Sequence, residues 1–215
     1  MYGAKTEVAA IEKSLDIEIE YVPFDLKDYY TPKHPEVVER NPKHQVPVLV
    51  DGDLSLYDST LIFEYFEDAF PDPPLWPVDP QARARARLLE LEADEVMFAA
   101  VQAVMPHRRA EFSDRERDDG LEMLRERYRM RDRELESREY LVGQFSYADI
   151  ALFGVDFYAR FLRRAPTEPL PGLDRWRSRM AARPSINQVF VRMCNFLGKA
   201  GLPASLDGSP TEAAS

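Results

Sequence analysis

The sequence contains few of the residues that crosslink a chain, hold a structural metal or span a membrane. Cys194 is the single cysteine, which excludes an internal disulfide, and the three histidines show no spacing with it that is typical of a zinc site. No apolar run is long enough to cross a bilayer, and residues 1–12 lack the apolar stretch of a secretory signal. These absences predict a cytoplasmic protein that binds no metal and enters no membrane.

Basic residues are also scarce relative to acidic ones. The 215 residues include 28 Lys and Arg against 38 Asp and Glu, which gives a formal net charge of -10. This sign opposes binding to nucleic-acid phosphates or to an anionic membrane surface, so neither is an expected partner. Apolar residues make up 45% of the chain and aromatic residues 11%, which is typical of a folded globular protein with one large domain or two small ones.

The N-terminal part of the sequence mixes helix and strand patterns. Apolar residues recur at helical spacing in residues 4–14, whereas residues 17–22 alternate apolar and polar side chains as a half-buried strand does. Residues 28–40 contain Pro32 and Pro35, which permit only a short helix. We therefore expect helix, strand and a short second helix in this order.

A β-hairpin and a third helix are expected next. Residues 46–50 and 54–57 are rich in apolar residues and flank an Asp51-Gly52 turn, which is a strong hairpin signal. Residues 59–69 then follow a helical pattern, and Ser59 is well placed to cap that helix. Residues 1–70 are thus expected to form an α/β domain.

The composition changes after this domain. Residues 71–80 hold five of the 17 prolines and are expected to form a linker, and residues 81–200 show helical patterns only. Ser146 and Asp149 have the spacing of a capping box at the start of one helix. The helices are expected over residues 82–105 and 115–136, from residue 146, and over residues 174–180 and 185–197, followed by a flexible tail over residues 201–215.

Three motifs around the proline linker resemble those of the cytosolic glutathione transferases, in particular theta-like and phi-like bacterial members. They are Asn41-Pro42-Lys43-His44-Gln45-Val46-Pro47-Val48-Leu49, Asp58-Ser59-Thr60-Leu61-Ile62-Phe63-Glu64-Tyr65-Phe66 and Leu141-Val142-Gly143-Gln144-Phe145-Ser146-Tyr147-Ala148-Asp149-Ile150. The resemblance implies a thioredoxin-like domain that binds glutathione, followed by an all-helical domain that helps to form a pocket for a small hydrophobic electrophile. It also implies a homodimer with two-fold symmetry.

The resemblance implies that Asp58 and Ser59 bind the γ-glutamyl end of glutathione. The Ser59 hydroxyl and the helix N-terminus would receive its carboxylate, and Asp58 would face its ammonium group. Glutamate is commoner than aspartate at the first of these positions in the family. Each residue also has a purely structural interpretation, Ser59 as a helix cap and Asp58 as a first-turn charge that favours the helix dipole.

The resemblance assigns the rest of glutathione to the loop before the hairpin. Pro47 matches a cis proline that exposes the backbone of Val46 for antiparallel pairing with the cysteinyl part of the ligand. Gln45 and Lys33 match positions whose side chains often reach the glycyl carboxylate. Glutathione is therefore the expected co-substrate, with no metal cofactor.

The group that activates the thiol is not evident. In the family it is a Ser, Tyr or Cys near the end of a first strand, and a gapless comparison puts that position just before Met1. We therefore expect the first strand and the catalytic hydroxyl to lie upstream of Met1, unless a partner chain supplies the strand. Tyr2 is the one nearby hydroxyl group and hence the candidate within the sequence.

Two functions follow from this resemblance. The first is a detoxification enzyme that uses glutathione to conjugate, reduce or dehalogenate a small hydrophobic electrophile. The alternative is a binding or regulatory module with the glutathione transferase fold and no catalysis, which the missing strand favours. His107 is expected to be a surface or packing residue, with the alternative that it lines the electrophile pocket together with Arg108. Cys194 is expected to be an inert small hydrophobic residue rather than a nucleophile.

Overall fold

The structure is a computed structural model that describes residues 1–25, 30–199, 201–202 and 204–206. It divides into two compact units, one formed by Tyr2–Pro74 and the other by Leu75–Ser215 together with Met1. The division falls inside the proline-rich segment. Most of the expected flexible tail lies outside the described residues.

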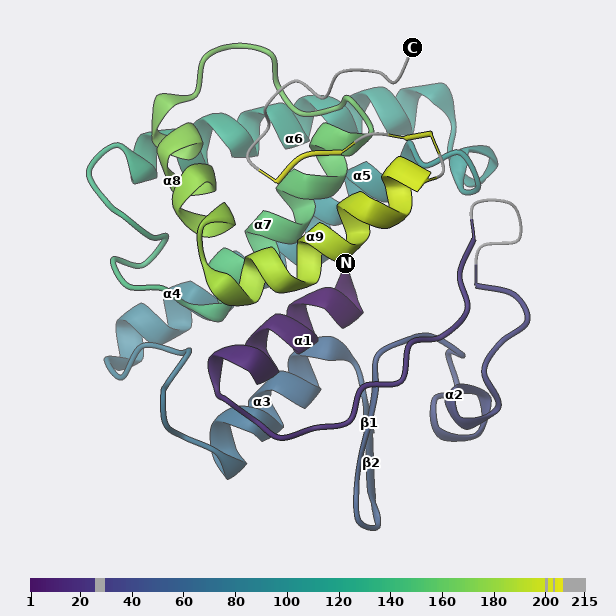
Figure 1. The fold of residues 1–215 in the computed structure, drawn as a ribbon. Coiled ribbons are helices and arrows are strands. Elements are labelled where there is room, and N and C mark those ends of the chain that lie inside the picture. Colours follow the sequence, from purple (N-terminus) through teal and green to yellow (C-terminus); the bar gives the residue numbers. More distant parts are fainter. Residues whose placement is uncertain (26–29, 200, 203, 207–215) are drawn as a thin grey trace. The chain divides into compact units, whose positions relative to one another are not determined.

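The N-terminal unit contains a hairpin and helices in the expected order (Figure 1). The hairpin strands pair antiparallel with Val48 opposite Tyr57 and Asp51 opposite Leu54, and Gly52 in the turn has a φ of +56°. The elements are α1 (Tyr2–Glu12), α2 (Pro35–Arg40), β1 (Val48–Asp51), β2 (Leu54–Tyr57) and α3 (Ser59–Ala69). The predicted helices and the hairpin are therefore confirmed.

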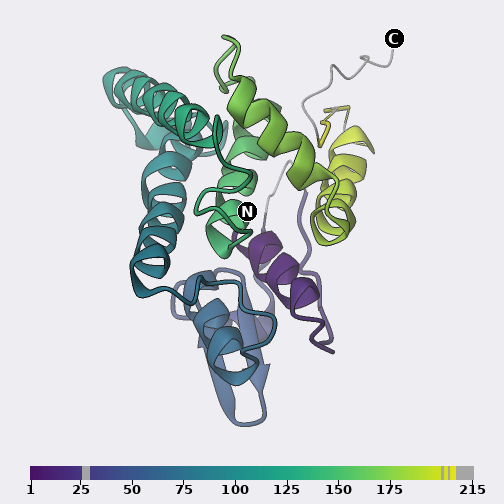
Figure 2. The same cartoon turned by 90° about the vertical axis from the view of Figure 1, so that its left-hand side faces the viewer.

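The core of this unit lies between α1, α3 and the hairpin. Ala10 of α1 packs with Ile62 and Phe66 of α3, and partly buried side chains from both strands, Leu49 and Leu56, complete the cluster. The two helices lie side by side in both views of the chain (Figures 1 and 2). This packing holds α3 against the hairpin, and α3 begins directly after Asp58, which follows β2.

The predicted strand over residues 17–22 is wrong. The segment is not a strand in the structure, and Ile17, Ile19 and Tyr21 are 36%, 38% and 60% exposed. Alternation of apolar and polar side chains describes the two faces of a pleated strand, but a strand forms only when a neighbouring backbone supplies its hydrogen bonds. Within the described residues the sheet consists of β1 and β2 alone.

A buried lysine joins the end of α1 to the end of α3. The Lys13 side chain is fully buried, and its Nζ donates to the carbonyl oxygens of Phe70 at 2.7 Å and Pro73 at 3.0 Å. It also forms an ion pair with Glu67 at 2.7 Å. The ammonium group therefore satisfies carbonyl groups left unpaired where α3 ends.

The second unit is helical. The expected helix over residues 82–105 is divided, because a π-helical segment separates α4 from α5 and the last turn ends at Ala103. A 3.6-residue pattern does not distinguish such a widened turn from an α-helical one. The elements are α4 (Pro80–Leu91), η1 (Glu92–Met97), α5 (Phe98–Ala103), η2 (Arg109–Glu111), α6 (Asp114–Leu135), α7 (Tyr147–Phe161), α8 (Pro171–Ala181) and α9 (Pro184–Lys199).

Helix α7 runs through the centre of this unit (Figure 1) and begins at the predicted capping box. The fully buried Asp149 carboxylate accepts hydrogen bonds from the backbone and hydroxyl of Ser146, each at 3.0 Å, from Leu141 N at 3.0 Å and from Trp176 Nε1 at 2.9 Å. Burial raises the pKa of Asp149 to about 6, although these four hydrogen bonds favour the ionised form. The structural interpretation of this box is confirmed, and it extends to α8 through Trp176.

A second buried carboxylate, Asp156, joins α7 to α8 and to the end of the described chain. It accepts from Arg160 Nε and Arg177 Nε, each at 2.8 Å, and Arg160 donates to the carbonyl oxygens of Ser205 and Leu206. Burial opposes ionisation, but the two guanidinium groups hold the pKa of Asp156 below its usual value.

In the described part of the chain, no helix is both long and apolar enough to cross a membrane.

Candidate functional site

The hairpin register brings most of the predicted glutathione-binding residues to one place. Because Val48 lies opposite Tyr57, the residues before β1 and those after β2 emerge at the same end of the hairpin. Gln45, Val46 and Pro47 precede β1, and Asp58 with Ser59 follows β2. The antiparallel pairing of β1 and β2 thus brings these five residues to the same end of the hairpin.

Asp58 is the N-cap of α3, a role that the sequence pattern assigned to Ser59. One carboxylate oxygen of Asp58 accepts from Thr60 N at 3.0 Å and from Leu61 N at 3.3 Å, whereas Ser59 is the first helical residue. Asp58 has a φ of +78°, which is strained for a residue with a side chain and is found most often at functional sites. Within the described residues, its second carboxylate oxygen has no hydrogen-bond donor.

The start of α3 is a favourable environment for an anion. Ser59 is 3% exposed, and the fully buried Lys5 places its Nζ 3.5 Å from the Thr60 hydroxyl oxygen. A lysine ammonium beside a helix N-terminus adds to the positive end of the helix dipole. Lys5 was missed by sequence reasoning. The available signal was its spacing of three and four residues from Val8 and Ala9, which puts it on the buried face of α1.

This local positive charge matters because the surrounding unit is acidic. Residues 1–74 contain 16 Asp and Glu against six Lys and Arg, so they carry the entire formal net charge of -10. Such a field repels small anions in general. An anionic ligand therefore needs the specific donors at the start of α3 and in the loop before β1.

The loop before β1 is held by a buried asparagine. Asn41 is 3% exposed, its Nδ2 donates to Gln45 O at 2.6 Å, and its Oδ1 accepts from Lys43 N at 2.9 Å. The Val46-Pro47 peptide bond is cis. In the described residues, the backbone N-H and C=O of Val46 form no hydrogen bond, and the Gln45 side chain is exposed.

The structure does not group Lys33 with these residues. Lys33 is exposed in the loop before α2, and its Nζ lies 4.0 Å from the centroid of the Tyr30 ring, in a cation-π contact. Its assignment to the glycyl carboxylate therefore depends on the resemblance alone.

Tyr2 lies in the first turn of α1. It is half-buried, its carbonyl oxygen accepts from the Thr6 hydroxyl at 3.1 Å, and its ring centroid is 5.8 Å from Lys5 Nζ. The ring of Tyr2 thus lies in a cation-π contact with Lys5.

The other candidate residues have structural partners. Arg108 forms an ion pair with Glu111 at 2.8 Å and donates to Gln102 Oε1 at 3.0 Å. Partial burial and the adjacent Arg108 lower the pKa of His107. Cys194 is partly buried, and burial raises the pKa of its thiol, which makes it a poor nucleophile. Within the ranges that the structure describes, no cluster of three or more His, Cys, Asp or Glu could hold a metal ion.

Comparison with known families matches both units. Residues 1–74 match the family model of the glutathione S-transferase N-terminal domain, and residues 93–184 match that of the glutathione S-transferase C-terminal domain. The site residues Lys33, Gln45, Val46, Asp58 and Ser59 all lie within the first match.

Similar proteins carry two kinds of name. A probable glutathione S-transferase of Solanum tuberosum is 26% identical over 82% of this chain and 82% of its own length. A stringent starvation protein A homolog of Coxiella burnetii is 33% identical over 48% of this chain, and the match spans 47% of that relative. A glutathione S-transferase of Methylobacillus flagellatus, solved with glutathione bound, is 32% identical, with a TM-score of 0.75 over 87% of this chain and 93% of its own.

Proposed function

The chain belongs to the glutathione S-transferase family, and on that premise we propose that it binds glutathione at the end of the hairpin and uses its thiol to attack a small hydrophobic electrophile. The observation that carries this proposal is the grouping of Gln45, Val46, Asp58 and Ser59 by the hairpin register. The glutathione-bound neighbour supports it, because its similarity covers nearly the whole of both chains.

The γ-glutamyl end of glutathione binds at the start of α3. Its carboxylate accepts from the Ser59 hydroxyl and benefits from the helix N-terminus and Lys5, while its ammonium group meets the second oxygen of Asp58. Asp58 thus has two functions, since its first oxygen already caps α3. The cap holds the carboxylate in place before the ligand arrives.

The remaining parts of glutathione bind along the loop before β1. The backbone N-H and C=O of Val46 pair with the cysteinyl residue as an added strand would, next to Pro47. The Gln45 side chain donates to the glycyl carboxylate, and Lys33 is the second candidate for that contact. Pairing with the Val46 backbone orients the cysteinyl residue, and with it the thiol, in the same way for any electrophile.

In the reaction, the bound thiol loses its proton and the sulfur attacks the electrophilic carbon. This forms a thioether, and the leaving group, a halide in a dehalogenation, departs with its electron pair while the thiol proton passes to solvent. Reduction of the substrate requires a second glutathione thiol, which attacks the thioether sulfur and leaves oxidised glutathione as the product. Holding the thiolate against an apolar substrate provides the rate gain by proximity. Tyr2 is the candidate in this chain to stabilise the thiolate, through a hydrogen bond donated by its hydroxyl group.

A second candidate function is a non-catalytic binding module of the same fold. It is favoured by the relatives named stringent starvation protein A homologs, although the matches span less than half of the length of the first three of them. Tyr2 is also the single candidate in this sequence for thiol activation, and a chain in which it does not reach the thiol would bind glutathione without turnover. The two functions share glutathione binding and differ in turnover.

The test combines retention on immobilised glutathione with turnover of a generic aryl halide. An enzyme is retained and forms the thioether at a rate that Tyr2→Phe lowers, whereas a non-catalytic module is retained without turnover. Lack of retention at any protein concentration would contradict both functions. Tyr65→Phe serves as the matched control for the tyrosine substitution, because the Tyr65 hydroxyl bonds to Asp51 at the turn of the hairpin, the end away from Gln45 and Asp58.

We also propose a cytoplasmic homodimer that takes part in detoxification. The single cysteine fits a reducing compartment, and two-fold dimers are the common assembly of the family. Light scattering at micromolar concentration should give twice the chain mass of 24.8 kDa. A monomer over that range would refute the assembly without affecting the glutathione site.

A further inference from the structure

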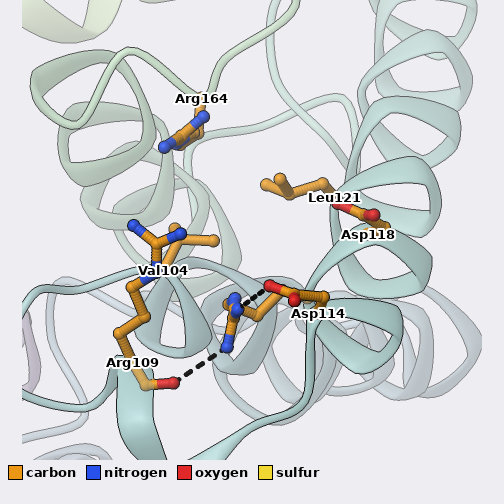
Figure 3. Close-up of a pocket in the computed structure, with 7 residues that line it drawn as sticks. Val104, Arg109, Asp114, Asp118, Leu121 and Arg164 are labelled. Carbon is orange, nitrogen blue, oxygen red and sulfur yellow. Dashed lines mark hydrogen bonds and ion pairs between the residues drawn. The ribbon is translucent and has the colours of Figure 1, made fainter.

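The helical unit contains a cavity at the start of α6, where no predicted site residue lies. It has a volume of about 160 Å³, smaller than the sites of drug-sized ligands. Its walls come from the end of α5, from η2, from the first two turns of α6 and from the segment after α7 (Figure 3). All of these segments belong to one compact unit, the helical one.

One arginine forms a fixed part of the wall. Arg117 donates to the carbonyl oxygens of Arg109, at 2.9 Å, and Phe112, and it forms an ion pair with Asp114. Its side chain is 13% exposed. These contacts neutralise the charges of Arg117 and Asp114 and join η2 to the first turn of α6.

Three other charged residues face the same cavity and are not neutralised. Among the described residues, the side chains of Arg109, Arg164 and Asp118 have no ion-pair or hydrogen-bond partner, and all three are exposed. In Figure 3 the two guanidinium groups lie on one side of the cavity and the Asp118 carboxylate lies on the other. The cavity therefore offers two positive charges opposite one negative charge.

Apolar side chains lie between these charges. Val104 and Leu121 line the same cavity, and Leu121 is 9% exposed. A ligand with charged ends and a short hydrocarbon part would place that part against these two side chains, where burial of CH₂ groups is favourable.

We propose that this cavity binds a small amino dicarboxylate. Such a molecule has two carboxylates for Arg109 and Arg164 and one ammonium group for Asp118, so its charges complement those of the cavity one by one. Guanidinium groups bind carboxylates through paired hydrogen bonds, which fixes the ligand orientation. A simple dianion would leave Asp118 opposed to a like charge, and a simple cation would face two arginines.

The test is calorimetric titration of the full chain at low ionic strength with L-glutamate and, in parallel, with glutarate. Glutarate has the same two carboxylates and carbon chain without the ammonium group. We expect L-glutamate to bind about ten-fold more tightly than glutarate, because the contact with Asp118 is charge-assisted. Equal affinities for the two ligands would overturn the proposal.

Three variants assign the binding to this cavity. Arg164→Gln should weaken both ligands about ten-fold, and Asp118→Asn should weaken L-glutamate while it strengthens glutarate. Because L-glutamate carries the carboxylate and ammonium groups assigned to Ser59 and Asp58, each titration is repeated in the Ser59→Ala background, where binding at the cavity should persist and Arg164→Gln should still weaken it about ten-fold. If Arg164→Gln has no effect in that background, the proposed cavity site is refuted.

Discussion

Replacing Asp58 by asparagine separates its proposed contact with glutathione from its role as a helix cap. Asparagine caps helices as well as aspartate does and tolerates positive φ, so it can keep the hydrogen bonds from Thr60 N and Leu61 N at the φ of +78°. The substitution removes only the negative charge that faces the ammonium group of glutathione. We therefore expect weaker binding without a loss of stability.

The size of the effect follows from the exposure of Asp58. Ion pairs at solvent-exposed positions contribute about 0.2–1 kcal/mol, and Asp58 is exposed in the free protein. Asp58→Asn should therefore weaken glutathione binding by about 0.5–1 kcal/mol, which is about two- to five-fold in Kd. The thermal midpoint should remain that of the unmodified chain.

Asp58→Ala is the matched comparison, because it removes the cap as well as the charge. Loss of an N-cap costs about 1 kcal/mol of stability, and alanine is also strained at positive φ, so its thermal midpoint should fall. Calorimetry with glutathione and thermal unfolding would be measured on both variants. Unchanged affinity in Asp58→Asn, with a lower midpoint in Asp58→Ala, would refute the ligand contact and leave the cap alone.

Three further predictions concern stability. Asp149→Ala should destabilise the helical unit, since four donors lose their acceptor, while the remaining folded protein still binds glutathione. The folded-state pKa of Asp149, about 6, lies above its ordinary 3.8, so the native state binds the proton more tightly than the unfolded state does. The stability of the unmodified chain relative to Asp149→Asn should therefore fall by about 2.5 kcal/mol as pH rises from 4 to 7, measured by urea unfolding. A pH-independent difference would contradict this. Lys13→Met should cost about 3–5 kcal/mol in the same assay, because it removes a buried ammonium group that pairs with Glu67 and with two carbonyl groups, and wild-type stability would show that the lysine is dispensable.

Local sequence signals predicted most of the fold. The Asp51-Gly52 turn, the helical spacing of residues 59–69 and the box at Ser146 and Asp149 each specify their structure within a few residues of chain. Residues 17–22 were predicted wrongly, because strand formation depends on a neighbouring backbone that the alternation pattern cannot reveal. The N-cap of α3 is Asp58 rather than the predicted Ser59, because aspartate and serine both favour the N-cap position.

The candidate site was predictable in its residue types but not in its electrostatics. The sequence suggested Gln45, Val46, Asp58 and Ser59, and the hairpin register groups them. Lys5 was missed because buried lysines are rare and composition treats them as surface residues. The charged groups around the cavity of the helical unit could not be predicted, because they come from segments between residues 104 and 164 that meet only in the folded chain.

Titration of glutathione into the full chain, compared with the Ser59→Ala variant, tests the central claim most directly. We expect saturable binding of one glutathione per chain, weakened in Ser59→Ala by about 1–3 kcal/mol, the cost of leaving a charged group without its donor. The thermal midpoint of the variant should change little, because Asp58 remains the cap of α3. No saturable binding, or wild-type affinity in Ser59→Ala, would contradict the account.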